Sequence, residues 1–287
     1  MRKIKIGTRG SLLALKQTQM AACEIKKAYP DIETEIVKIS TKGDSNTDKQ
    51  LSELGGDGLF VREIEAALSK GLIDIAVHSG KDLPAVSNAR YEVCAVLKRG
   101  DVRDCIAFKK GTDISCIENP VIGTGSRRRE NLIKRFIPEC IVKPLRGNVP
   151  TRLKKLEKGE YDAVILAMAG LERLGIKEDW LEIIPFCEET FVPAANQGII
   201  AVEALKESEA AVLLNKIDDA ETHFLFDAQR LWMSAVGAGC HEAAGVYIKT
   251  TAKTLELTCF YKDSKIITKT IPDKNIKEIV KTAKELL

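Results

Sequence analysis

Hydrophobic and polar positions along the chain alternate between the periods of strands and helices, and this pattern predicts an α/β protein. The first residues, Met1-Arg-Lys-Ile-Lys-Ile6, have the two-residue period of a strand, and apolar positions after Ser11 recur at helical spacing. Alternating strands and helices favour parallel sheets. Further helices are expected at 60–68 and around 153–156, and further strands at 36–39 and 163–166.

Two echoes suggest that the first 200 residues contain two related units. Ile6-Gly-Thr-Arg-Gly-Ser11 returns as Ile122-Gly-Thr-Gly-Ser126, and the approach to a buried strand at 71–77 returns at 159–164. Matches of this length also arise by chance, so the repeat stays open. If it is real, each unit presents a strand, a small turn and a helix N-terminus, and the ligand site lies in the cleft between the units.

The pattern changes after about residue 217 and predicts a small α+β domain at the C-terminus. A helix is expected at 224–236, strands at 244–248 and 254–261, and a lysine-rich helix at the end. Between the first helix and the first strand lies Val236-Gly-Ala-Gly-Cys240-His-Glu242, a turn of small residues that presents a thiol. Such a thiol can act as a nucleophile or as a covalent anchor. Much earlier, the glycine-rich segment 40–58 predicts a long mobile loop that could serve as a lid.

Composition narrows the class of protein and its compartment. The 287 residues are 45% hydrophobic, enough for a sizeable core, and the net charge of +3 gives no global field for nucleic acid or membranes. The eight cysteines are spread without a Cys-x-x-Cys pair, so neither a disulfide framework nor a zinc site is expected. No apolar run approaches the roughly 18 residues of a membrane span. We therefore expect a cytoplasmic protein, and the lack of a heptad pattern favours a monomer.

Basic side chains gather at turns and helix starts in a pattern suited to binding oxyanions. Guanidinium groups bind carboxylates or phosphates in a bidentate manner, and helix N-termini add N–H donors. The alternative is a solvated basic face. The set comprises Arg9, Lys81, Arg127, Arg128, Arg129, Arg146, Arg152 and Arg173, accompanied by Ser11, Thr124, Ser126 and Asn148.

Lys81 and Asp82 follow a buried strand and precede Pro84, so both charges are expected at the ligand-binding edge of a sheet. A carboxylate there can protonate a leaving group or stabilise a developing cation. The alternative is a local ion pair at the strand end. His78, on the same strand, is more typical of a satisfied core residue than of a catalytic base, and adjacent Cys240 and His241 make a weak case for a thiol protease.

Six motifs in register over nearly the whole chain resemble the porphobilinogen deaminase family, also called hydroxymethylbilane synthases. They are Ile6-Gly-Thr-Arg-Gly-Ser11, Val77-His-Ser-Gly-Lys-Asp-Leu-Pro84, Ile122-Gly-Thr-Gly-Ser-Arg-Arg-Arg129, Leu145-Arg-Gly-Asn-Val149, Pro193-Ala-Ala-Asn-Gln-Gly198 and Gly239-Cys240. The resemblance implies a transferase of haem and porphyrin (tetrapyrrole) biosynthesis. Four porphobilinogen molecules are joined head to tail on a covalent dipyrromethane cofactor with loss of ammonia, and hydrolysis then frees hydroxymethylbilane.

The resemblance also implies a fold and a division into domains. Two α/β domains like those of periplasmic binding proteins are expected around a cleft, followed by a small α+β domain that carries the cofactor cysteine. The implied limits are 1–97 plus 197–216 for the first domain, 98–196 for the second and 217–287 for the third.

Site residues carry over by position from the family's motifs. Cys240 matches the cysteine that holds dipyrromethane through a thioether, and Asp82 matches the catalytic acid. Many cations are needed because every pyrrole ring carries an acetate and a propionate. The implied cofactor contacts are Lys81, Asp82, Ser126, Arg128, Arg129 and Arg146, and the implied substrate contacts are Arg9, Ser11, Thr124, Arg128, Arg152 and Arg173.

Several positions depart from the family's usual pattern, although none removes the acid or the anchor. Asp57 reverses a charge in the expected lid. The other departures are Gly80 for methionine, Asn196 for glycine, Ala235 for an arginine, and Gly237-Ala238 for Glu-Gly.

Two other functions can be weighed against the enzyme. A two-lobed binding protein that closes on an anionic ligand would have no need of a thiol in a third domain. A nucleic-acid-binding module built on 127–129 calls for a more basic chain with interleaved aromatic residues, whereas aromatic residues make up only 5% here. We therefore expect porphobilinogen as the partner, with neither nucleic acid nor a membrane.

Overall fold

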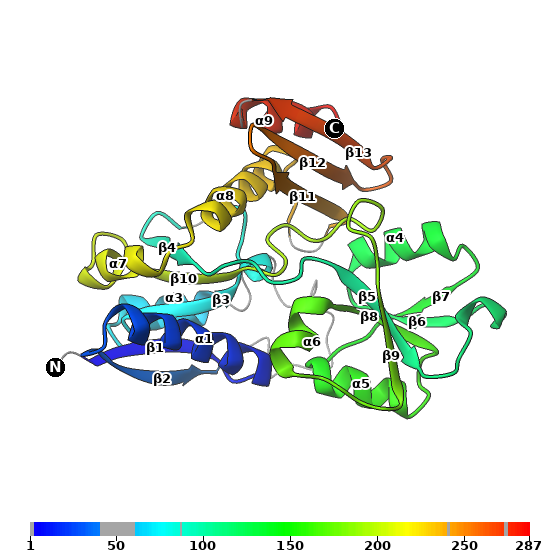
Figure 1. Ribbon diagram of the computed structural model, residues 1–287, viewed down its shortest axis with the longest axis horizontal. Helices are drawn as coiled ribbons and strands as arrows, with labels where there is room; N and C mark the ends of the chain where they lie inside the picture. Colours follow the sequence, from blue (N-terminus) through cyan, green and yellow to red (C-terminus); the bar gives the residue numbers. More distant parts are fainter. Residues whose placement is uncertain (1–2, 41–60, 87, 240–241, 273–274) are drawn as a thin grey trace.

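The chain folds into two α/β units side by side and a smaller α+β unit above them, each unit with its own sheet (Figure 1). The computed structural model describes residues 3–40, 61–86, 88–239, 242–272 and 275–287. This is the expected fold class. The expected lid, apart from Ser40, lies outside the described residues, as do Asp57 and Cys240.

The first unit has a five-stranded sheet in the order β2-β1-β3-β10-β4. β1 runs parallel to β2 and β3, and β10 runs antiparallel to both β3 and β4. Strand β10, which is fourth in this order, comes from a part of the chain more than 100 residues beyond the other four strands. The elements are β1 (Lys3–Arg9), α1 (Leu12–Ala28), β2 (Glu33–Ile39), α3 (Arg62–Ser69), β3 (Ile75–Ser79), the 3₁₀ turn η2 (Gly80–Asp82), β4 (Tyr91–Val96), β10 (Ile200–Leu205), α7 (Glu209–Leu214) and η4 (Asn215–Ile217).

The second unit repeats this design with the order β7-β6-β8-β5-β9. β6 is parallel to β7 and β8, while β5 is antiparallel to β8 and β9. The sequence echo is therefore a true structural repeat. The alternation of strands and helices favoured parallel sheets, and each sheet is parallel except for one strand that runs in the opposite direction. The elements are β5 (Asp104–Lys109), η3 (Ile114–Cys116), β6 (Val121–Gly123), α4 (Arg127–Phe136), β7 (Ile141–Lys143), α5 (Val149–Glu157), β8 (Ala163–Ala167), α6 (Met168–Leu174) and β9 (Leu181–Pro185).

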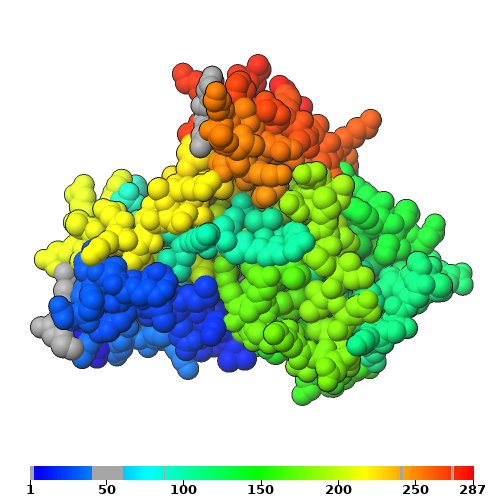
Figure 2. All heavy atoms as spheres, viewed as in Figure 1, coloured from blue at the N-terminus to red at the C-terminus, as the bar shows by residue number. Residues whose placement is uncertain are grey.

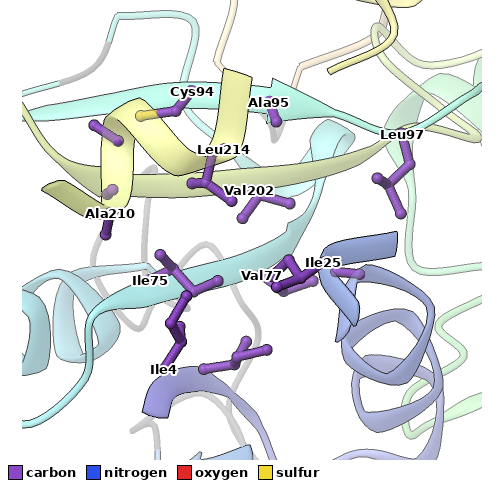
Figure 3. Packing of buried hydrophobic residues seen from close by; sticks show 14 of the residues in the cluster. Ile4, Ile25, Ile75, Val77, Cys94, Ala95, Leu97, Val202, Ala210 and Leu214 are labelled. Carbon is purple, nitrogen blue, oxygen red and sulfur yellow. The ribbon is translucent and has the colours of Figure 1, made fainter. Parts of the chain in front are cut away.

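The core of the first unit lies between its sheet and the helices that cover it. Ile75 and Val77 of β3 and Val202 of β10 pack with Ile25 of α1 and Leu214 of α7 (Figure 3). Burying each large aliphatic side chain contributes about 1.5 to 3 kcal/mol. The central strands β3 and β10 are buried almost throughout, which fixes the position of the turn that follows β3.

The third unit places two helices against an antiparallel sheet of three strands, β11-β12-β13. Trp232 of α8 and Ile279 of α9 pack on Leu257 of β12 in one buried cluster. Figure 2 shows this unit, in orange and red, resting on the other two. Strand β13 is the one element here that the sequence pattern did not predict. The elements are α8 (Ala220–Ala235), β11 (Ala244–Thr250), β12 (Thr254–Tyr261), β13 (Ile267–Pro272) and α9 (Ile276–Lys284).

Two chain crossings join the first and second units, and they are hydrogen-bonded to each other. The N–H of Gly100 donates to the carbonyl of Gly198 at 3.0 Å. Gly198 has a φ of +85°, and a Cβ there would lie 2.7 Å from the carbonyl oxygen of Gly100, so this crossing requires glycine. Arg99 ties the crossings to the third unit, donating from Nε to the Gln197 carbonyl at 2.8 Å and from Nη2 to Gln229 at 3.4 Å. In the described parts of the chain, no helix has the length and apolar character needed to span a membrane.

Candidate functional site

The turn η2 brings Lys81 and Asp82 to the carboxyl end of β3, where the sequence predicted them. The N–H of Gly80 donates to the carbonyl of Ile199 at 2.9 Å, which ties the start of this turn to the segment before β10. Both charged side chains are half-buried. Arg9, at the end of the adjacent parallel strand β1, places Nη1 3.9 Å from Oδ2 of Asp82. An acid and two cations therefore meet at one edge of the first sheet.

In the second unit, α4 begins at the equivalent edge of the sheet and carries two buried arginines. Arg128 and Arg129 are only 4% and 6% exposed. Nη1 of Arg128 donates to Oδ2 of Asp104 at 2.7 Å, while Nε and Nη2 of Arg129 donate to Oδ1 of the same residue at 3.0 and 2.7 Å. Each guanidinium also donates to a backbone carbonyl, that of Val192 or Ile165.

Asp104, at the start of β5, is fully buried and anchors this pair. Burial alone would raise the pKa of Asp104, but the positive charges of Arg128 and Arg129 outweigh it and hold the pKa well below its usual range. One carboxylate faces two guanidinium groups, so the cluster keeps a net positive charge. Our sequence reasoning missed Asp104, because no motif marks it.

Gln197 joins the acid-bearing turn of the first unit to the arginine cluster of the second. Its Nε2 donates to Oδ1 of Asp104 at 3.0 Å, and its Oε1 accepts from Nζ of Lys81 at 3.4 Å. Burial and the nearby charge of Arg129 lower the pKa of Lys81 to about 8, although Asp82 and Asp104 act in the opposite direction. Gln197 was not among the expected site residues, although it lies in one of the six quoted motifs.

Two other arginines expected at the site, Arg152 and Arg173, lie in different surroundings. Burial and the charge of Arg129 lower the pKa of Arg152 to about 10, with Asp82 opposing and Arg146 adding to the shift, so Arg152 lies within electrostatic reach of the acid. Its Nε donates to the carbonyl of Gly147 at 2.7 Å. Arg173, on α6, instead donates from Nη2 to the carbonyl of Gly198 at 2.5 Å, at the crossing between the units.

The hydroxyl and amide members of the expected set stabilise helix starts and turns. Ser11 accepts from the N–H of Ala14 at 3.3 Å and caps α1. Ser126 accepts from the N–H of Arg129 at 3.4 Å and caps α4, in the equivalent place of the repeat. The remaining members are Thr124, whose Oγ1 accepts from the N–H of Ser126 at 3.2 Å, Asn148, which caps α5, and Arg127, which is exposed.

A cavity lies where the three units meet, and its lining includes side chains suited to an anionic group. Lys81 comes from the first unit, Ser126 and Arg128 from the second, and Gly239 from the third. Cationic and hydroxyl donors are the groups that bind carboxylates. The lining therefore suits an anionic ligand, and Gly239 is the last described residue before Cys240 in the chain.

Buried thiols elsewhere in the described chain are poor candidates for a covalent anchor. Burial raises the pKa of Cys94, Cys105 and Cys259 to about 12 in each case. A thiol must ionise to act as a nucleophile, so these three remain unreactive. His78 is also a core residue, as expected, since its Nε2 lies 3.0 Å from Oε2 of buried Glu203.

Two of the departures from the family's pattern are in contact with each other. Gly80 packs against Asn196, whose Cβ would lie 3.2 Å from any Cβ placed at position 80. Apart from Asp57, which lies outside the described residues, the others lie at the end of α8, where Ala235 is the last helical residue, Gly237 has a φ of +65° and Ala238 is buried.

The sequence is similar to known proteins over its whole length. Residues 4–212 match the family model described as porphobilinogen deaminase, dipyromethane cofactor binding domain. The porphobilinogen deaminase of Acetivibrio thermocellus is 43% identical over 261 residues, covering 91% of this chain and 88% of that protein. The porphobilinogen deaminase of Oceanobacillus iheyensis is 39% identical over 293 residues, covering 100% of this chain and 94% of that protein.

Solved structures with looser similarity include a periplasmic domain and a probable extracellular-binding protein. The VFT2 domain of Bordetella pertussis BvgS matches with a TM-score of 0.44 and 14% identity, over 78% of this chain and 92% of that one. The probable amino-acid ABC transporter extracellular-binding protein YtmK of Bacillus subtilis matches with a TM-score of 0.44 and 12% identity, over 82% of this chain and 96% of that one. The sequence matches decide the assignment: the chain belongs to the porphobilinogen deaminase family.

Proposed function

We propose that this enzyme uses Asp82 as its catalytic acid and Cys240 as the anchor of its cofactor. As a porphobilinogen deaminase, the chain is a transferase of tetrapyrrole biosynthesis that carries dipyrromethane. It joins four porphobilinogen molecules head to tail with loss of ammonia, and hydrolysis then frees hydroxymethylbilane. The observation that carries the residue assignment is the meeting of Lys81 and Gly239, the chain neighbours of Asp82 and Cys240, with Arg128 around one cavity.

Cys240 would hold the cofactor through a thioether, with carboxylate contacts from the cavity lining. Lys81, Ser126 and Arg128 provide an ammonium, a hydroxyl and a guanidinium there. Arg129 and Arg146 are the further proposed contacts of the cofactor, together with Asp82. When bound, dipyrromethane supplies the pyrrole carbon on which the chain of rings is built.

Asp82 is suited to both parts of the substrate's chemistry. The amine of porphobilinogen leaves as ammonia only when protonated, and the cation that remains on the substrate needs a negative charge nearby. Arg9, 3.9 Å from the Asp82 carboxylate, restrains that side chain from the neighbouring strand. Lys81, which precedes Asp82 in the chain, provides a positive charge that can bind the carboxylates of the pyrrole rings.

Incoming porphobilinogen would place its acetate and propionate groups among the remaining cations. The proposed contacts are Arg9, Ser11, Thr124, Arg128, Arg152 and Arg173. The electrostatic coupling of Arg152 to both Asp82 and Arg129 supports its place in this set. Because Asp104 balances only one of the two buried arginine charges, the pair can still attract an anionic ring.

We further propose the domain limits 1–97 plus 197–216, 98–196 and 217–287, and a monomer working in the cytoplasm. The return of β10 to the first sheet supports the discontinuous first domain. The spread of the cysteines supports a reducing compartment. Light scattering of the purified protein tests the monomer.

The intact mass of the protein tests the anchor directly. Cofactor-free protein incubated with porphobilinogen should gain the mass of a dipyrromethane that survives denaturation, and Cys240→Ala should gain none. Cys187→Ala is the control, because Cys187 is an exposed thiol that is not among the proposed site residues. A wild-type Cys240 that stays unmodified after incubation would contradict the proposal.

A further inference from the structure

The internal repeat gives the strands of the second sheet counterparts in the first. In the two sheet orders, β5 takes the place of β10, and β9 takes the place of β4. Strands β10 and β5 pair with equivalent positions of β3 and β8. Ile106 and Phe108 of β5 therefore correspond to Val202 and Ala204 of β10.

In the first unit, a short helix covers these positions. The chain leaves β10 and soon forms α7, which lies against β10 and β4 (Figure 1). Ala210 and Leu214 of α7 belong to the same buried cluster as Val202 and Ala204. Ala95 of β4, in that cluster too, is 0% exposed. One helix therefore completes this face of the first sheet.

The second unit leaves the equivalent face open. Every residue between β5 and β6 is described, and this stretch forms only the 3₁₀ turn η3 where the first unit has α7. Ile184 of β9, which pairs with Ile106, is 46% exposed, and Phe136 at the end of α4 is 48% exposed. A cavity of about 930 Å³ lies here, and its lining includes both of them together with Ile106 and Phe108.

The charged side chains around this cavity are acidic. Among the described residues, its lining includes no lysine and no arginine. This is the reverse of the cavity where the three units meet, whose lining includes Lys81 and Arg128. An apolar floor with acidic margins is complementary to a helix that has lysine or arginine beside its apolar face. The acidic residues are Asp113, Glu118, Glu139 and Glu182.

The acidic cavity is separate from the proposed catalytic site. No described residue lines both cavities. Helix α4 carries Arg128 in its first turn and Phe136 as its last residue, and its ten residues span about 15 Å. A ligand on this face would therefore leave the catalytic cavity accessible.

We propose that the acidic cavity is a docking site for a short basic amphipathic helix of a partner protein, bound where α7 packs in the first unit. Apolar side chains of that helix bury Ile184 and Phe136, and its cations pair with Glu118, Glu139 and Glu182. Concave patches of exposed apolar side chains commonly mark interaction sites. This inference goes beyond the proposed function and requires neither Asp82 nor Cys240.

Binding of a synthetic peptide tests the inference. The probe is a fluorescently labelled peptide with leucines at helical spacing and lysines on both flanks. A side-chain lactam bridge holds it helical, because short helices are marginal in water. Fluorescence anisotropy should show saturable binding to the full chain that weakens as salt is added. The same peptide with glutamates in place of the lysines should bind much more weakly.

Ile184→Lys should weaken binding of the basic peptide about tenfold or more, since it places a cation in the centre of the contact. Ile141→Lys is the matched control, because Ile141 is 48% exposed on β7 of the same sheet and lies outside the cavity. Glu118→Gln combined with Glu139→Gln should weaken binding and reduce its dependence on salt. Turnover of porphobilinogen should be normal in all these variants.

Four outcomes would overturn the inference, and none of them bears on the proposed function. Wild-type protein might fail to bind the basic peptide at about 1 mM, the weak end of specific affinities. The acidic peptide could bind as tightly as the basic one, or Ile184→Lys could bind no more weakly than Ile141→Lys. Finally, wild-type self-association that Ile184→Lys abolishes would assign this face to a second copy of the chain.

Discussion

Asp74 and Asp162 occupy the same place in the two halves of the repeat. Oδ2 of Asp74 accepts from the N–H of Lys5 at 2.8 Å, and Oδ2 of Asp162 accepts from the N–H of Val121 at 2.7 Å. Each aspartate's own N–H in turn donates at 2.9 Å to the carbonyl of the same strand residue. The pair fixes the register of the two parallel strands that end at the site, β1 with β3 and β6 with β8.

Removing either carboxylate should therefore loosen its sheet. Asp162→Ala should lower the free energy of unfolding by about 1.5 to 3 kcal/mol, the range for hydrogen bonds to charged groups. Asp74→Ala should lower the free energy of unfolding by a smaller amount, because Asp74 is exposed and Asp162 is half-buried. Urea unfolding measures both, with exposed Asp179→Ala as the control. Equal stability of Asp162→Ala and the control would contradict this role.

Asp82→Asn should lower turnover roughly 100- to 1000-fold, as expected for loss of a group aimed at developing charge. The amide keeps the shape of the side chain but can neither protonate the amine nor balance the cation. Steady-state consumption of porphobilinogen measures the loss, and intact mass should show that the cofactor is retained. Asp179→Asn, on the surface, should turn over normally. Near-normal turnover of Asp82→Asn would refute the assignment.

Asp104→Asn should destabilise the protein by about 3 to 5 kcal/mol, because it leaves two buried guanidinium groups without a counter-charge. The pH dependence provides a check. The folded-state pKa of Asp104 lies below its unfolded value of about 3.9, so its contribution is present above that pH and is lost as the pH falls further. The difference in stability between wild type and variant should shrink below about pH 4. A difference that stays constant with pH would assign the loss to packing alone.

Lys81 should make the cofactor-free protein less stable near neutral pH. Its folded-state pKa of about 8 lies below the usual 10.5, so the unfolded chain binds the extra proton between those values. This cost is fully present below about pH 8 and is relieved as the pH rises toward 10.5. Lys81→Gln should therefore be more stable than wild type at pH 7, with the advantage fading by pH 10. The same substitution should weaken retention of the anionic cofactor. A stability advantage that does not change with pH would contradict the shifted pKa.

Alkylation of the native protein should separate its thiols into two groups. Exposed Cys23, Cys116 and Cys187 should react with iodoacetamide at mildly alkaline pH. Cys94, Cys105 and Cys259 should be spared, since their raised pKa values and burial leave little thiolate. Peptide mapping after a short exposure distinguishes the groups. Prompt labelling of Cys259 would show that the third unit opens more readily than its packing indicates.

The sequence predicted most of the elements, because the local pattern decides them. Strand β12 has the expected limits, and the helix expected after Ser11 begins at Leu12. The placement of Lys81 and Asp82 at a strand end also followed from the buried run before them. The lid and Cys240 remain sequence-based predictions, since both lie outside the described residues.

What the sequence could not predict depends on contacts between distant segments. Arg128 and Arg129 were expected to face carboxylates of the ligand, but the structure also binds both to Asp104, 24 and 25 residues away. Nothing local marks Asp104 as their partner, because it begins an apolar strand. Gln197 was missed for the same reason, because it connects Lys81 to Asp104 only when the two units pack together.

The position of β10 has a consequence for how the protein is made. This strand lies between β3 and β4, so the first sheet lacks an inner strand until residues 200–205 have left the ribosome. The second sheet draws all its strands from residues 104–185 and can close earlier. Domains fold as units during synthesis, so the middle of the chain completes its fold before the beginning does. The N-terminal strands must wait, with their apolar faces exposed, and this interval is when a growing chain is most open to aggregation and to chaperones.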